Sequence, residues 1–102
     1  MKLLKVVEST RPEKKLMAVF QTDNGRTKTV HFGAANMDDY TITHDKDQRD
    51  RYRARHKKDL NTNDPTRAGY LSMAILWGDS KSRRKNIEAY RAKYNLYLPT
   101  PP

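Results

Sequence analysis

The stretch that most constrains the fold is residues 64–80, the longest weakly charged run in a highly charged chain. Asp64 and Pro65 are typical of the N-cap and the first position of a helix. Two adjoining apolar stripes then recur at helical spacing, and they consist of Leu71, Ala74, Ile75 and Gly78 and of Tyr70, Met73 and Trp77. A helix that is apolar over so wide an arc is usually buried on more than one side. We therefore expect a central helix that ends at a left-handed Gly78, with Trp77 either in the core or at a partner interface.

Composition limits the size of the core and the kind of partner. The chain has 102 residues, enough for one small domain, with 35% hydrophobic and 32% charged residues. The formal net charge of +9 favours nucleic acid, anionic lipid or an acidic protein surface as partner. The absence of cysteine excludes disulfides and thiolate metal sites. No run approaches the roughly 18 apolar residues of a membrane span, and no signal peptide is recognisable, so a soluble intracellular protein is expected.

The first third of the chain predicts a small antiparallel meander. Residues 3–8 are one expected strand, and residues 15–22 and 26–32 are a hairpin around Asn24-Gly25, a strong hairpin signal. A two-residue turn there would pair Val19 with Val30 and Met17 with Phe32, and these four apolar residues would share the core-facing side. The opposite side would carry Leu16, Ala18, Phe20, Thr29 and His31. Such a sheet needs a helical layer against it.

Two more helices flank the central one. Asp45 followed by Gln48 is typical of a capping box and predicts a helix over residues 46–59. Its only sizeable apolar residue before Leu60 is Tyr52, so it is expected at the surface. The last helix should run over about residues 81–95, with an inner face formed by Ile87, Tyr90 and Tyr94.

We therefore predict an α+β domain over residues 1–95, a β-meander of about three strands followed by three α-helices, with residues 64–78 at its centre. The expected core residues are Leu71, Ile75, Trp77, Tyr90 and Tyr94. Residues 96–102 should form an extended proline-rich tail, because proline cannot continue a helix. That tail is either a disordered end or an arm anchored on a neighbour by Tyr97 or Leu98.

Two basic segments give the strongest chemical signal. Residues 46–58 carry seven Lys or Arg against two Asp, and residues 81–93 carry six against one Glu. Two basic helices can bind phosphates or the carboxylates of a neighbouring protein, or they can be solvated faces with local ion pairs. The expected partner-binding residues are Arg49, Arg53, Lys57, Lys58, Arg83, Arg84, Lys85 and Arg91.

The chain shows no defensible catalytic or metal motif. The three histidines have no close ligand spacing, although His44 could join Asp45 and Asp47 in a divalent metal site of the kind nucleases use. Short Asp-rich loops more often serve as turns and caps. We find no phosphate loop, dinucleotide fingerprint or nucleophile with its base. We therefore expect no enzyme, no cofactor, no metal and no small-molecule substrate.

Two stretches carry a family resemblance. The first runs from Thr29-Val30-His31-Phe32-Gly33-Ala34 through Asp39-Tyr40-Thr41 and His44-Asp45 to Arg49, Arg51-Tyr52 and Arg55-His56. The second is Ala68-Gly69-Tyr70-Leu71-Ser72 with Ile75-Leu76-Trp77. Together they resemble small basic proteins of unknown function from large DNA viruses of algae and amoebae (phycodnavirus-like). The resemblance covers roughly residues 27–95 and departs at Asn36-Met37-Asp38, where a Gly-Tyr-Ser-like turn is expected.

The resemblance supplies no catalytic residues, but it implies a viral origin and a place in the particle. Several of its residues can also be interpreted as an internal polar network that ties the loop to the first helix. It is formed by His44, Asp45, Arg51, Arg55 and His56, which lie among Asp38, Asp39 and Tyr40. This interpretation competes with an active-site interpretation of the same residues, and we prefer the network.

The expected function is that of a structural virion protein, a minor capsid or internal capsid-cementing protein. It would bind larger capsid proteins or other virion proteins through its basic helices and tail. The alternative is a non-specific DNA-binding or genome-packaging protein of the same particle. The expected location is the capsid interior or shell, and the host cytoplasm or nucleus during assembly.

Overall fold

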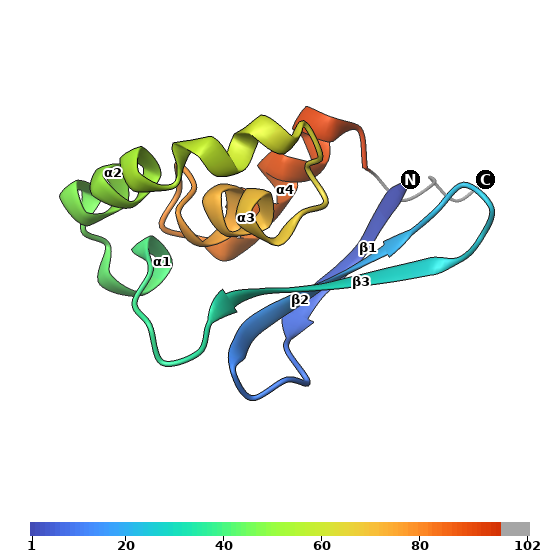
Figure 1. The fold of residues 1–102 in the computed structure, drawn as a ribbon, viewed down its shortest axis with the longest axis horizontal. Coiled ribbons are helices and arrows are strands. Elements are labelled where there is room, and N and C mark those ends of the chain that lie inside the picture. Colours follow the sequence, from blue (N-terminus) through green and yellow to red (C-terminus); the bar gives the residue numbers. More distant parts are fainter. Residues whose placement is uncertain (97–102) are drawn as a thin grey trace.

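The protein is a sheet covered on one face by helices, and the computed structural model describes residues 1–96. Three antiparallel strands, in the order β1-β2-β3, span Lys2–Glu8, Lys14–Gln21 and Thr27–Ala34. The helical layer lies on one side of this sheet (Figure 1), and it comprises α1 (Tyr40–Thr43), α2 (Lys46–Arg55), the 3-10 helix η1 (Lys57–Thr62), α3 (Ala68–Leu71), the π-helix η2 (Ser72–Leu76) and α4 (Arg83–Tyr94). The predicted α+β class is therefore confirmed. Within residues 1–96, no helix has the length and apolar character needed to cross a membrane.

The β2–β3 hairpin is offset by one residue from the predicted register. Met17 pairs with His31, and Val19 pairs with Thr29. The turn holds three residues, not two, and Thr22 N–H closes it by donating to the Arg26 carbonyl at 2.8 Å. Gly25, at φ +85°, takes the left-handed position that such a loop requires.

This shift exchanges the two faces of β2, because successive side chains of a strand point to opposite sides. The core-facing residues of the hairpin are Leu16, Ala18, Phe20, Val30 and Phe32. The prediction that Met17 and Val19 lie on the main core-facing side was wrong, because the face with Leu16, Ala18 and Phe20 is the one buried under the helices.

The central segment is shorter and more irregular than the predicted helix over 64–78. The Asp64 carboxylate accepts hydrogen bonds from the backbone N–H and the hydroxyl of Thr66, at 3.0 and 2.6 Å. These bonds hold a turn, so the helix begins only at Ala68. From Ser72 the bonding becomes π-helical, with Trp77 N–H donating to the Ser72 carbonyl at 3.0 Å.

Gly78 does not adopt the expected left-handed conformation. Its missing side chain instead permits a close approach, because a Cβ there would lie 2.2 Å from the Ala74 carbonyl oxygen and 2.7 Å from Cγ of Asn86. Asn86 is buried and donates to the carbonyls of Ile75 and Ser80, at 2.9 and 2.8 Å. The end of η2 is thereby fastened to α4.

The core lies between the sheet and the segment from α3 to α4. Of the expected core residues, Leu71, Ile75, Trp77 and Tyr90 are buried, and Tyr94 is half-buried against them. Leu96 is buried as well, and its carbonyl accepts a hydrogen bond from Leu3 N–H at 3.0 Å. The predicted boundary of the tail at residue 96 is therefore one residue too early. The expected anchors Tyr97 and Leu98 lie outside the described residues.

Candidate functional site

Helix α2 uses two of its five cations to pack against the domain. Its N-cap is Asp45, as predicted, which accepts from Gln48 N–H at 3.0 Å, but the helix ends at Arg55. The guanidinium of buried Arg49 lies 4.8 Å from the centre of the Tyr40 ring. Arg53 donates to the Trp77 carbonyl at 2.8 Å and to the Asp79 carboxylate at 2.9 Å.

The expectation that Arg49 and Arg53 face a partner is thus corrected, because both are engaged inside the domain. The same holds for Arg91, whose guanidinium donates to the carbonyls of Leu3 and Leu4, at 3.0 and 3.3 Å. It holds in part for Arg83, which binds Asp39 at 3.1 Å and retains about a third of its side-chain exposure.

A buried carboxylate, Asp39, forms the internal polar centre, with two basic partners that sequence reasoning missed. Its side chain is 1% exposed and binds Lys15 Nζ at 2.7 Å and the Arg83 guanidinium at 3.1 Å. It also caps α1 by accepting from the backbone N–H of Thr41, at 2.8 Å, and from the Thr41 hydroxyl. One carboxylate therefore links β2, α1 and α4.

Electrostatics keep Asp39 ionised. Burial alone would raise its pKa, but hydrogen bonds from Lys15 and Thr41 and the charges of Lys15 and Arg83 outweigh burial, and the pKa lies below the ordinary 3.8. A group with a lowered pKa contributes stability above its unfolded-state pKa and loses it as the pH falls through the folded-state value.

We therefore expect Asp39 to contribute to acid unfolding. The free energy of unfolding of the parent should fall relative to that of Asp39→Asn as the pH drops below about 3.8, the ordinary pKa. Urea titrations of both proteins at several pH values between about 2 and 7 would measure this difference. A difference in stability between the two proteins that stays constant across that range would contradict a lowered pKa of Asp39.

The residues expected to form a network do not converge. His44 ends α1 in a left-handed conformation and is exposed, and Asp45 caps α2. Arg51 and Arg55 are exposed and make no ion pair within residues 1–96. His56 lies 3.2 Å from the Asp59 carboxylate. The local signal for the true network was Asp39 two residues before Thr41, which is typical of an N-cap.

Three stacked rings fix α2 on the central segment. The Tyr52 ring lies between Trp77 and His56, with centroid distances of 4.2 and 4.1 Å. Burial, followed by the charge of Asp59, raises the pKa of Tyr52. The stack leaves the other side of α2 free to face outward.

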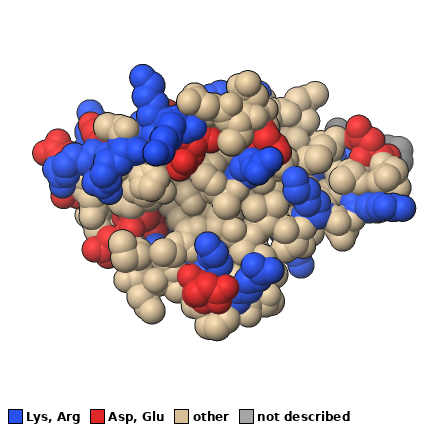
Figure 2. Space-filling view, in the orientation of Figure 1, with Lys and Arg blue, Asp and Glu red and all other residues tan. Residues whose placement is uncertain are grey.

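That outward side and η1 form the α2–η1 basic surface, which we define as Lys46, Arg51, Arg55, Lys57 and Lys58. All five residues are exposed, and the exposed carboxylates nearby are Asp45, Asp47 and Asp50. Figure 2 shows Lys and Arg side chains gathered over the end of the molecule where α2 lies in Figure 1. Arg84 and Lys85 are also exposed, on α4.

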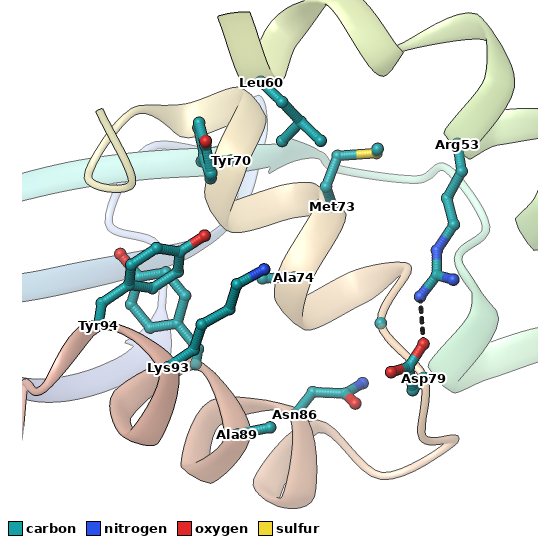
Figure 3. A pocket seen from close by; sticks show the side chains of 12 residues that line it. Arg53, Leu60, Tyr70, Met73, Ala74, Asp79, Asn86, Ala89, Lys93 and Tyr94 are labelled. Atoms are coloured by element: carbon teal, nitrogen blue, oxygen red, sulfur yellow. Dashed lines mark hydrogen bonds and ion pairs between the residues drawn. The ribbon is translucent and has the colours of Figure 1, made fainter. Parts of the chain in front are cut away.

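A cavity of about 420 Å³ lies within the helical layer (Figure 3). We call it the helical groove, and its lining comes from α2, η1, α3, η2 with the loop that follows it, and α4: Arg53, Leu60, Tyr70, Met73, Ala74, Gly78, Asp79, Asn86, Ala89, Tyr90, Lys93 and Tyr94. Its volume falls within the usual range for ligand pockets, roughly 300–1,000 Å³. Sequence reasoning missed this groove, because its residues come from five segments.

No cluster of three or more His, Asp or Glu side chains suited to a metal ion exists within residues 1–96. His44, Asp45 and Asp47 therefore do not form the metal site considered above. His44 and Asp45 instead have capping roles at the junction of α1 and α2.

Comparison with known proteins identifies the family. A family model described as "Family of unknown function (DUF5754)" matches residues 4–56, just over half of the chain. The chain belongs to DUF5754. The DUF5754 match includes the sheet, Asp39 and α2, and it ends before α3, η2 and α4, which supply most of the groove. Neither the curated proteins nor the solved structures contain a match to this chain.

Proposed function

We propose that the chain is a structural virion protein, a minor capsid or internal capsid-cementing protein, that binds a larger acidic component. The observation that carries the proposal is the α2–η1 basic surface, whose five cations make no ion pair within residues 1–96. A fixed surface with uncompensated charge favours an oppositely charged partner and speeds its association. The viral assignment rests on the resemblance described above.

The second candidate is a non-specific DNA-binding or packaging protein, and the same surface favours it. Arg51 and Arg55 lie four residues apart on one side of α2, and Lys58 is exposed in η1, which follows. Against this candidate, Arg49, Arg53 and Arg91 are engaged internally and add little to a phosphate-binding track. We therefore prefer an acidic protein surface.

Fractionation of purified virus particles tests the proposal directly. Particles would be opened, the emptied shell separated from the released genome, and the protein quantified in each fraction by mass spectrometry. Recovery with the shell is the expected result, recovery with the genome would favour packaging, and absence from particles would overturn both.

A charge-removal variant separates the two candidates in solution. For duplex DNA we expect a dissociation constant on the order of 10⁻⁴–10⁻⁶ M at physiological salt, the non-specific level. The triple variant Arg51→Ala, Arg55→Ala, Lys58→Ala should keep the parent melting temperature, because no hydrogen bond of these side chains is present in residues 1–96. Fluorescence anisotropy across a salt series would measure the dissociation constants of the parent and of the triple variant for duplex DNA.

The matched control is Lys5→Ala, Arg11→Ala, Arg26→Ala, which removes the same charge from exposed positions in the sheet region. If the α2–η1 basic surface contacts DNA, each lost phosphate contact should reduce the log–log salt slope by about 0.9 in the triple variant and not in the control. Binding of the parent far tighter than the non-specific level would favour the packaging role.

A further inference from the structure

The helical groove has an apolar, aromatic floor. Leu60, Met73 and Ala74 line it from η1 and η2 and are half-buried. Tyr70 and Tyr94 meet edge to face there, with ring centroids 6.1 Å apart. Apolar pockets with a few polar groups at their walls are the usual form of binding sites. A leucine- or phenylalanine-sized side chain suits this floor.

The wall of the groove carries an unpaired positive charge. Lys93 extends from α4 across the cavity toward Ala74 (Figure 3). It is exposed, lies 5.5 Å from the centre of the Tyr94 ring, and makes no ion pair within residues 1–96. The other charges in the lining, Arg53 and Asp79, neutralise one another at 2.9 Å. The groove therefore favours an anionic occupant.

The groove is bordered by the two elements that carry the α2–η1 basic surface. Arg53 of α2 and Leu60 of η1 line it, and Lys57 lies between them in sequence at helical spacing. A second copy of this chain is disfavoured as occupant, because two copies of net charge +9 repel each other.

We propose that the helical groove binds a segment of an acidic partner protein in which an apolar anchor residue is flanked by Asp or Glu. The anchor occupies the floor formed by Met73, Ala74 and the tyrosines, and a flanking carboxylate binds Lys93. This inference rests on the proposed function, since it specifies how the acidic partner is recognised.

Selection from a random library of 12-residue peptides displayed on phage, against the immobilised full chain, tests the proposal. We expect enriched peptides to carry Leu, Phe, Met or Trp beside Asp or Glu. A synthetic peptide of the enriched sequence should bind Ala89→Glu at least tenfold more weakly than the parent, because Ala89 lines the groove. Ala92→Glu is the matched control, being an exposed position of α4 outside the lining, and should stay within about threefold of the parent.

A second variant isolates the charge. Lys93→Gln should weaken the binding of the acidic peptide. It should leave unchanged the binding of a peptide in which Asn and Gln replace Asp and Glu. The proposal is overturned if no peptide is enriched, if the enriched peptides lack acidic or apolar residues, or if Ala89→Glu and Ala92→Glu weaken binding equally. It is also overturned if sedimentation shows a dimer of the parent that Ala89→Glu dissociates, because a second copy would then occupy the groove.

The failure of this inference is distinguishable from failure of the proposed function. Peptides that bind the groove while the protein is absent from virus particles would contradict the virion role alone. Recovery with the emptied shell, together with binding that is insensitive to Ala89→Glu, would contradict the groove alone.

Discussion

Asp39→Ala is expected to destabilise the domain by about 3–5 kcal/mol, the cost of removing one member of a buried ion pair. The substitution leaves Lys15, whose side chain is 13% exposed, and the Arg83 guanidinium together without a counter-charge. It also removes the cap of α1. Small domains have a total stability of roughly 5–15 kcal/mol, so the variant should be close to unfolding at 37 °C.

Equilibrium unfolding in urea, followed by circular dichroism, would measure this loss. Asp38→Ala is the matched control. The Asp38 carboxylate is exposed, so its removal should change the free energy of unfolding by less than about 0.5 kcal/mol. Asp39→Asn keeps the shape of the side chain and should lie between the two. An Asp39→Ala protein within 1 kcal/mol of the parent would show that the buried cations find other partners.

Trp77→Ala is expected to cost about 3–5 kcal/mol as well, the usual range for truncating a buried aromatic residue. Trp77 is 7% exposed and lies parallel to Tyr52 with 4.2 Å between ring centres. Its loss opens a cavity and removes the surface on which α2 rests. Thermal and urea unfolding would record the change, and Trp77→Phe should lose much less because it retains a ring against Tyr52.

The alternative for Trp77 is a role as an interface anchor. In that case Trp77→Ala would melt like the parent but would no longer join its partner. That combination of results would refute the core assignment.

Local signals predicted the elements of the sheet, but not its register. Asn24-Gly25 correctly marks the hairpin, yet the same dipeptide fits a two-residue and a three-residue turn. The choice of three residues, with Gly25 alone at positive φ, decides which side of β2 meets the helices. The greater apolar character of Leu16, Ala18 and Phe20 over Met17 and Val19 was the remaining clue.

The inner side of α2 could also have been derived from its one large apolar residue. Arg49, Tyr52, Arg53 and His56 recur at helical spacing, and they are the residues that contact the domain. Arginine can occupy such positions because its methylene stem packs while its guanidinium reaches polar atoms. The total charge of residues 46–58 does not distinguish the arginines that pack against the domain from those that are exposed.

The network around Asp39 was less accessible to sequence reasoning. Lys15 lies 24 residues before Asp39 in the chain, and Arg83 lies 44 residues after it. No local spacing links such residues, since the fold alone brings them together. The groove was hidden for the same reason.

The hydrogen bond between Leu3 and Leu96 has a consequence for biosynthesis. A ribosome releases a protein from its N-terminus, so β1 emerges long before α4 and the residue that follows it. Until Arg91 and Leu96 emerge, the backbone groups of Leu3 and the carbonyl of Leu4 at the outer edge of β1 lack these partners, and unpaired edge groups readily recruit other strands. We expect prematurely terminated translation products to be prone to aggregation. Once α4 and Leu96 are synthesised, they should protect this part of the β1 edge.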